Sequence, residues 1–423
     1  MNFITTSGSQ FRDGTKRFRF VGVNDWDFGK LSTSMPLSDI QSTVGYMKAD
    51  GISVVRISVA GNESNSARNY RYISGSTLNW REASFVQIDN VLNELSNAGI
   101  RCILHFTDEF NWGTDKSIYC GWSNTVYGTS YDTTTGDNFH TDNNIITWFK
   151  EYCAQFINRV NTVNGITYKN DPTIFAWELG NELRYRNDGL GGETNTGTTS
   201  SSFVATLSSW QSTMAAYIKS LDSNHLVSAG DTAHFVDDVV GDSLHDGTAS
   251  YGQDFINMSK DENIDYFDFH MYPWASNPTN TLNKYGQSLG YPNSASFNGW
   301  LAQLDQYVYY AKLAGKPIII GELGISLNNN LNDLLVSYPR HVALSNILKH
   351  FFNRNGDGIL LWHYKIEDQN NYGIYPVSSH SVDYSLPSEN ANDTNLRSII
   401  SQINYKINGK RILVDKIAPG TSL

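Results

Sequence analysis

The stretch from Ile174 to Glu182, IFAWELGNE, is the clearest structural signal in this chain of 423 residues. It begins as a short, largely apolar run and ends in a glycine, an amide and a carboxylate. Such a run is typical of a parallel strand whose outer face is covered by helices. The polar residues that follow it then lie at the carboxyl end of the strand, where barrel proteins of this class place their functional groups.

Seven further runs of this kind alternate with longer amphipathic segments. The eight expected strands are Arg19–Asn24, Ser53–Ser58, Arg101–Phe106, Ile174–Gly180, Leu226–Gly230, Tyr266–Tyr272, Pro317–Glu322 and Gly358–His363. The expected helices are Ile40–Ala49, Phe85–Ala98, Ile145–Val160, Phe203–Leu221, Trp300–Ala314 and Val342–Asn353, with glycines at 51, 99 and 315 as helix ends. Alternation of this kind predicts βα units, and eight strands predict a (β/α)8 TIM barrel. We therefore expect an α/β fold in which residues 1–423 form a single catalytic domain, because no linker divides the chain.

Three long segments, each rich in Gly, Asn, Ser and Thr, account for the length beyond a minimal barrel. They are Gly113–Asn144, Tyr185–Ser202 and Ala275–Asn298. Each follows an expected strand, so we place all three at the C-terminal face of the barrel. Loops of this length in a compact domain are usually functional. We expect them to form the walls of a groove.

The composition restricts the classes of partner. Acidic residues outnumber basic ones by 42 to 31, which gives a net charge of −11 and argues against nucleic acid. No apolar run approaches the roughly 20 residues of a membrane span, so we expect no membrane association. Only 17% of residues are charged, whereas 13% are aromatic. A surface of amides, hydroxyls and aromatic rings suits a neutral, hydroxyl-rich ligand, although a secreted protein without a particular ligand has the same composition.

Two carboxylates stand at strand ends that face each other across the top of a barrel. Glu182 follows the fourth expected strand, and Glu322 ends the seventh. Two such groups can flank a glycosidic bond, and retaining hydrolysis requires them to be about 5–5.5 Å apart. Either residue alone is more simply a strand-end carboxylate held by an arginine. The pair together favours the catalytic interpretation.

Other strand ends supply supporting side chains. Arg56 can pair with Glu322 and keep it ionised, although a purely structural ion pair is equally compatible with its position. Alternation along the sixth strand sends both His270 and Tyr272 into the barrel. The remaining candidates are Asn181 for a sugar hydroxyl, Trp362 as a stacking floor or a core aromatic, and Trp112 as a more distant platform. His105 is expected to point inward, and Asp108 and Glu109 are either part of the site or solvated loop charges.

At this point the sequence resembles glycoside hydrolase family 5, and in particular its fungal and plant-type endo-β-1,4-mannanases. The segments that carry the likeness are Asp137–Asp142, Asn158–Thr162, Tyr168–Glu182, Leu221–Val227, Ile264–Pro273, and Asp368 with Tyr372–Pro376. The chain departs from the family pattern at Leu183, where a proline is usual, and after the first strand at Gly22–Phe28.

Carried over by position, the resemblance implies a two-step retaining mechanism. Glu322 is the nucleophile and Glu182 the acid/base, with Arg56, Asn181, His270, Tyr272 and Trp362 around the cleaved sugar. We expect the neighbouring carboxylate to raise the pKa of Glu182. No metal and no organic cofactor are expected. The protein is expected to be a monomer, secreted with its signal segment outside this sequence, although a periplasmic or intracellular location is also compatible.

The sequence leaves three activities open. The first is a retaining endo-mannanase acting on a polysaccharide or oligosaccharide in an open groove. The second is an exo-β-mannosidase or another β-glycanase whose groove is closed by an inserted loop. The third is a carbohydrate-binding barrel without activity, which the presence of both glutamates disfavours. Cys102 is expected to be a core thiol, and the sequence does not decide whether Cys120 and Cys153 pair.

Overall fold

All eight expected strands form one parallel sheet in the computed structural model. The model describes residues 1–25, 27–29, 35–61, 69–110, 116–185, 201–232, 252–258, 260–272, 297–325, 340–364 and 399–407. In chain order the barrel strands are β4 (Phe20–Asn24), β5 (Val54–Ser58), β8 (Arg101–His105), β9 (Ile174–Glu178), β10 (Leu226–Ser228), β11 (Phe267–Met271), β12 (Ile318–Leu323) and β13 (Gly358–Leu361). Their order in the sheet is β10-β9-β8-β5-β4-β13-β12-β11. The predicted (β/α)8 TIM barrel is confirmed.

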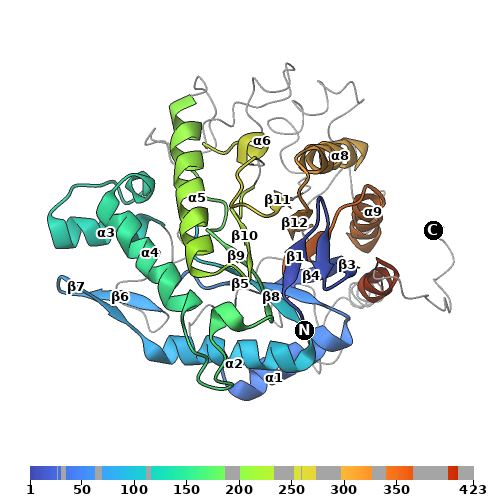
Figure 1. Cartoon of the computed structure of the whole chain (residues 1–423), viewed down its shortest axis with the longest axis horizontal. Helices are drawn as coiled ribbons and strands as arrows, with labels where there is room; N and C mark the ends of the chain where they lie inside the picture. Colours follow the sequence, from blue (N-terminus) through green and yellow to red (C-terminus); the bar gives the residue numbers. More distant parts are fainter. Residues whose placement is uncertain are drawn as a thin grey trace, which may run out of the picture.

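The six expected helices are also present and pack around the sheet (Figure 1). They are α1 (Leu37–Ala49), α2 (Glu82–Ala98), α4 (Asn143–Ile157), α5 (Ser201–Leu221), α8 (Phe297–Leu313) and α9 (Arg340–Asn353). The short helix α6 (Phe255–Met258) follows β10, and residues 399–407 are helical after β13. Glycines 51, 99 and 315 have positive φ angles of 77°, 77° and 74°, as expected of residues that end helices.

Several smaller elements were not predicted. An N-terminal antiparallel sheet consists of β1 (Ile4–Thr6), β2 (Phe11–Asp13) and β3 (Lys16–Phe18), and a hairpin of β6 (Arg71–Ser74) and β7 (Thr77–Trp80) precedes α2. The first long segment contains α3 (Lys116–Tyr127) and the 3-10 turn η1 (Asp137–His140), and η2 (Tyr168–Asn170) precedes β9. The short strands escaped prediction because three or four residues give almost no periodic signal, whereas α3, with 12 residues, was included in the long segment expected to be a loop.

Side chains join the two ends of the barrel sheet, β10 and β11. Asp265 accepts a hydrogen bond from the Val227 amide at 2.7 Å, and the Asp265 amide donates to the Val227 carbonyl at 2.8 Å. Farther along, Oδ1 of Asp268 accepts from the Ser228 hydroxyl at 3.2 Å and from the Asp231 amide at 3.3 Å. The barrel is therefore nearly closed by backbone ladders and completed by aspartates.

The barrel interior changes from apolar to polar along its strands. A small apolar cluster fills the N-terminal end, where Phe11 of β2 makes edge-to-face contacts with Phe175 and Tyr266 at centroid distances of 5.0 and 5.4 Å. Val54 of β5 and Ala176 of β9 belong to this cluster. Two residues farther along the same strands lie Arg56 and Glu178, and both are buried. The N-terminal half of the barrel thus supplies hydrophobic stability, and the C-terminal half carries the charged groups.

Some sequence expectations lie outside the described residues. They include Trp112, the motif with Asp368 and Tyr372–Pro376, and most of the segments Tyr185–Ser202 and Ala275–Asn298. The described cysteines are all free and buried, so Cys120 and Cys153 are not joined. Among the described residues, no helix is both long and apolar enough to cross a membrane.

Candidate active site

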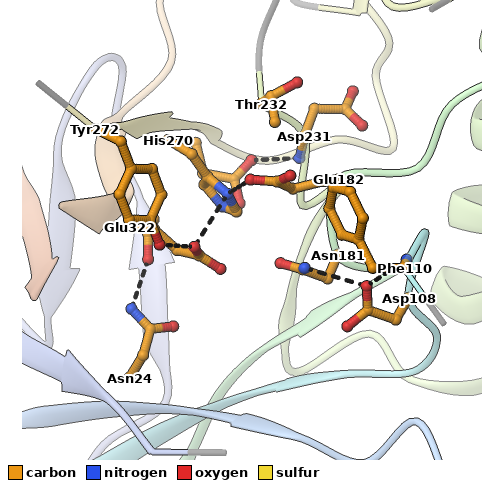
Figure 2. A network of polar contacts seen from close by, with 12 residues as sticks. Asn24, Asp108, Phe110, Asn181, Glu182, Asp231, Thr232, His270, Tyr272 and Glu322 are labelled. Carbon is orange, nitrogen blue, oxygen red and sulfur yellow. Dashed lines mark hydrogen bonds and ion pairs between the residues drawn. The ribbon is translucent and has the colours of Figure 1, made fainter. Parts of the chain in front are cut away.

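The C-terminal ends of four strands bring the expected polar side chains together around Arg56. Figure 2 shows His270 and Tyr272 from β11 beside Glu322 of β12, with Glu182 and Asn181 opposite them after β9. Arg56, Glu182 and Glu322 are buried, with at most 8% of each residue exposed. Apart from Trp112, every predicted site residue is described. The structure therefore places the two glutamates predicted to be catalytic at one site.

A bulge in β12 aims Glu322 into the barrel. Phe269 pairs with Ile320, but the next residue of β11, His270, pairs with Glu322 and leaves Gly321 unpaired. Ile319 faces the interior cluster, so regular alternation would send Gly321 inward and Glu322 outward. The extra residue reverses this, as bulges beside active sites often do. A side chain at Gly321 would also come within 3.1 Å of the His270 ring.

Close backbone contact between β9 and β10 fixes the position of Glu182. Its φ angle is 56°, a left-handed value that is uncommon outside glycine, and its amide donates to the Gly230 carbonyl at 2.7 Å. A Cβ atom at Gly230 would lie only 1.8 Å from the Gly180 carbonyl oxygen. Leu183, the departure from the family pattern, is buried and packs over Gly180. The segment after β9 therefore depends on two glycines.

Arg56 is the central cation of the site. Its Nη1 donates to Oε1 of Glu322 at 2.9 Å and to Oδ1 of Asn24 at 3.2 Å, and its Nη2 donates to Oδ1 of Asn181 at 2.9 Å. Its Nε donates to Oε2 of Glu178 at 2.6 Å. Burial alone would lower the pKa of Arg56, but the two carboxylates outweigh burial and raise it. The arginine is a permanent positive charge beneath Glu322.

The His270 ring lies between the two expected catalytic carboxyls. Its Nδ1 is 2.5 Å from Oε1 of Glu182 and 3.6 Å from Oε2 of Glu322. One carboxylate oxygen of each glutamate and a ring nitrogen of His270 all lie within 4.8 Å of one another. Tyr272 donates its phenolic hydrogen to Oε2 of Glu322. These distances correspond to the close carboxyl pair of a retaining glycosidase.

Comparison with known proteins agrees with this geometry. Residues 1–354 match the model of the GH family 5 beta-mannosidase-like proteins. The chain belongs to this family. It is therefore a mannanase-like glycoside hydrolase, and its substrate is a carbohydrate.

Individual relatives of this family 5 hydrolase are distant. The chain is 28% identical to mannan endo-1,4-beta-mannosidase 7 of Arabidopsis thaliana over 327 aligned residues. The alignment covers 77% of this chain and 68% of that protein. The endo-1,4-beta-mannanase of Rhizomucor miehei has the same fold, with a TM-score of 0.74, 23% identity and coverage of 95% of this chain and 99% of that one. A family 5 mannosidase of the same organism gives a TM-score of 0.63 at 18% identity, covering 95% and 99%. Proteins named as mannanase and as mannosidase thus share this fold.

The ionisation of the two glutamates differs from the sequence expectation. Burial would raise the pKa of Glu182, but the hydrogen bond and charge of His270, with Arg184 and Arg56 behind it, lower the pKa instead. The pKa of Glu322 is raised, chiefly by burial. Burial also opposes the charged form of His270, yet the two carboxylates raise its pKa to about 8. The expected rise in the pKa of Glu182 is therefore wrong for this geometry, because the adjacent His270 lowers the pKa of the carboxyl.

Trp362 lies directly after β13, where its amide donates to the Leu323 carbonyl at 2.8 Å. Its side chain is only partly buried, unlike that of a core aromatic residue. Leu323 directly follows Glu322, so this contact places Trp362 at the rim beside the nucleophile candidate. His105 is buried in β8, as expected, and burial together with Arg56 lowers its pKa.

Buried charges around the acid/base candidate were only partly anticipated. Asp108 and Glu109 are buried, which excludes the interpretation as solvated loop charges. Asp108 accepts from the Phe110 amide at 2.9 Å and from Asn181 at 3.3 Å, and burial raises its pKa to about 8. Glu109 pairs with Lys116 at 2.9 Å. Carboxylates that stand shortly after a buried strand and beside an aromatic residue, as Asp108 and Glu109 do, are a sequence sign of a buried position.

Two residues near the centre were missed by sequence reasoning. Glu178 was read as part of an apolar strand, although a carboxylate inside such a run requires a buried partner. Arg184, two residues after Glu182, approaches it with a nitrogen–oxygen distance of 3.9 Å. The side chains of Glu182, His270 and Glu322 are also of the types that bind cations, but in this geometry Nδ1 of His270 is engaged by Glu182.

Proposed function

We propose that this glycoside hydrolase cleaves β-1,4-linked mannans by a retaining, two-step mechanism. Glu322 acts as the nucleophile and Glu182 as the acid/base. The observation that carries the proposal is the close approach of the two buried carboxyls, whose nearest oxygens are within 4.8 Å. An inverting enzyme needs roughly 6.5–9.5 Å between its carboxyl groups to accommodate a water molecule. The spacing here favours direct attack by one carboxylate.

In the first step Glu322 attacks the anomeric carbon as the glycosidic carbon–oxygen bond breaks. Arg56 holds Oε1 of Glu322 and Tyr272 donates to Oε2, so the attacking carboxylate is oriented through both oxygens. The departing oxygen takes a proton from Glu182. At neutral pH the Glu182–His270 pair holds this proton, because the pKa of His270 is raised to about 8, and the proton moves to Glu182 across their 2.5 Å contact as charge develops on the departing oxygen.

In the second step a water molecule attacks the anomeric carbon and releases Glu322. Glu182, now ionised, accepts a proton from this water, so the residue acts first as an acid and then as a base. The Arg56 guanidinium stabilises the carboxylate that departs from the sugar. Two displacements on the same carbon retain its configuration.

The substrate and the endo mode rest on separate support. The curated relatives at 26–29% identity are named mannan endo-1,4-beta-mannosidases, and this chain spans about two thirds of the first of them. The partly exposed Trp362 at the rim provides an aromatic face for a sugar ring. Mannan is therefore the substrate we propose, with attack within the chain.

The first test is a time course of products from mannan, mannohexaose and cellohexaose. Early release of several intermediate manno-oligosaccharides supports the proposal. Mannose or mannobiose as the sole early product contradicts the endo mode and identifies an exo-enzyme. Hydrolysis of cellohexaose alone contradicts the mannan preference.

The roles of the two glutamates are tested with azide. Glu322→Ala should lose most activity, and azide should restore turnover and yield the α-glycosyl azide. Glu182→Ala, assayed with an activated aryl mannoside, should yield the β-glycosyl azide, because the covalent intermediate still forms. Near-normal hydrolysis of mannohexaose by either variant, without azide, contradicts the assignment.

A further inference from the structure

Glu178 is a buried carboxylate that has no place in the mechanism above. It lies at the end of β9, four residues before Glu182, and is completely buried. Its Oε2 accepts from Nε of Arg56 at 2.6 Å, and its Oε1 accepts from the Tyr266 hydroxyl at 3.1 Å. Both oxygens are thus engaged beneath the site, and neither is available to a sugar.

The Arg56 guanidinium is shared between two carboxylates. Glu178 binds the Nε edge at 2.6 Å, and Glu322 binds Nη1 at 2.9 Å. A guanidinium is planar, so a partner at Nε fixes the orientation of both terminal nitrogens. The remaining contacts of those nitrogens, with Asn24 and Asn181, are neutral amides. Among the described residues, Glu178 is the one carboxylate besides Glu322 that accepts a direct hydrogen bond from Arg56, so the two compete for its charge.

We propose that Glu178 is a positioning residue that sets the reactivity of the nucleophile. It orients Arg56 toward Glu322 and, by taking part of the positive charge, prevents Arg56 from over-stabilising the ionised nucleophile. Intrinsic nucleophilicity falls as the pKa of the attacking group falls, so a carboxylate that is held too tightly by a cation is a weaker nucleophile. This inference rests on the proposed role of Glu322 and adds a residue that acts on it through Arg56.

Substitution of Glu178 removes none of the other charged groups that face Glu322. They are Arg56 from β5, Glu182 after β9, and His270 and Tyr272 from β11, with Asp108 contributing at longer range. Asp268 of β11 also faces Arg56, but burial and the neighbouring Glu178 raise the pKa of its carboxyl well above its usual range. A change in the ionisation of Glu322 after substitution of Glu178 therefore reports on the charge that Arg56 delivers.

The test is the pH dependence of kcat/KM for mannohexaose in two variants with opposite expected shifts. In Glu178→Gln, Arg56 is left to Glu322 alone, so the pKa of Glu322 falls and the acidic limb moves down by roughly one pH unit. The kcat at the plateau should fall roughly ten- to a hundredfold with little change in KM. In Tyr266→Phe, Glu178 loses a hydrogen-bond donor and binds Arg56 more strongly. The acidic limb should then move to higher pH.

A purely structural role of Glu178 predicts a different result. Loss of folded protein lowers activity equally at every pH and moves neither limb. Unchanged acidic limbs in both variants would therefore overturn the inference. If Glu178→Gln does not fold, Tyr266→Phe decides alone, because the phenylalanine keeps the ring contacts with Phe11 and Phe175. Glu178→Asp, which keeps the charge, should restore the position of the limb.

The same preparations separate this inference from the function on which it rests. Azide rescue of Glu322→Ala reports on the nucleophile and is independent of Glu178. If rescue succeeds and the limbs do not move, only the role of Glu178 is wrong. If rescue fails, the assignment of Glu322 is wrong, whatever the Glu178 variants show.

Discussion

Nδ1 of His270 lies 2.5 Å from Oε1 of Glu182, and both side chains are buried at the carboxyl ends of their strands. A histidine in this position shares a proton with the carboxyl that must later deliver one. The pair, rather than either residue, is then the acid in the proposed mechanism. The first step can occur only when this pair carries the proton that the departing oxygen takes.

The pair predicts a loss of activity at moderately alkaline pH. Burial disfavours the charged form of His270, but the two carboxylates raise its pKa to about 8. Above that pH the proton is lost and kcat/KM should fall. The protonated form also stabilises the fold, so this contribution is complete below pH 6.5 and disappears as the pH rises through about 8. A pH profile of kcat/KM measures the limb.

Substitution identifies the histidine responsible for that limb. In His270→Asn the proton is held by Glu182 alone, so the alkaline limb should move to lower pH. His350→Asn is the matched control, because His350 also contacts a carboxylate, Asp305 at 2.7 Å, but lies on α9. Activity that stays constant to pH 9 in the unmodified enzyme would contradict the prediction, as would an equal shift in the control.

The close contact of Gly230 with the segment that carries Glu182 predicts a strong effect of a single methyl group added at Gly230. In Gly230→Ala the new Cβ would lie 1.8 Å from the Gly180 carbonyl, so the segment that carries Glu182 must move. A displacement of about 1 Å can cost a hundredfold in rate, and we expect kcat to fall by at least that factor. Gly128→Ala is the control, because Gly128 also has a positive φ, 68°, but no atom near its missing Cβ. Comparable kcat in the two variants would refute this account.

Much of the barrel and part of the site were predictable from the sequence. Continuous apolar runs are a strong signal for strands covered by helices, and all eight were found. Alternation along β11 correctly placed His270 and Tyr272 on the interior face. The two glutamates were singled out because they stand at strand ends that face each other across the top of a barrel, where they can flank a glycosidic bond.

The remaining features depend on contacts that a single sequence does not display. The bulge at Gly321 reverses the direction of Glu322, and the isolated glycine in the run Ile318–Glu322 is the one sign of it, which does not by itself fix the register. Glu178 was overlooked because its partner, Arg56, is 122 positions away. The direction of the Glu182 pKa shift depends on the rotamer of His270, which sequence alone does not fix.

Tyr272→Phe should make Glu322 harder to ionise without disturbing its position. The phenol donates to Oε2 of Glu322, and Arg56 still holds Oε1. A donor favours the ionised carboxylate, so its removal should raise the pKa of Glu322 further and move the acidic limb to higher pH. A lost hydrogen bond to a charged group costs about 1.5–3 kcal/mol, so at pH values below the limb kcat/KM should fall roughly ten- to a hundredfold. An acidic limb at the same pH as in the unmodified enzyme would rule out this contact as a determinant.

Asp89 should govern stability and not activity, because none of its hydrogen-bond partners is a candidate site residue. This residue of α2 is completely buried and accepts hydrogen bonds from Arg159 at 2.9 and 2.7 Å and from the Tyr168 hydroxyl at 2.6 Å. Asp89→Ala leaves the arginine without its buried partner and should lower the free energy of unfolding by about 3–5 kcal/mol, as measured by urea titration. Glu82 contacts the same arginine at 2.7 Å, but its side chain is 64% exposed, so Glu82→Gln should cost less than about 1 kcal/mol. Both carboxylates contact the same cation, Arg159, so the two variants differ mainly in the burial of the residue removed. Equal losses of unfolding free energy would show that burial does not explain the importance of Asp89. The kcat of both variants should equal that of the unmodified enzyme.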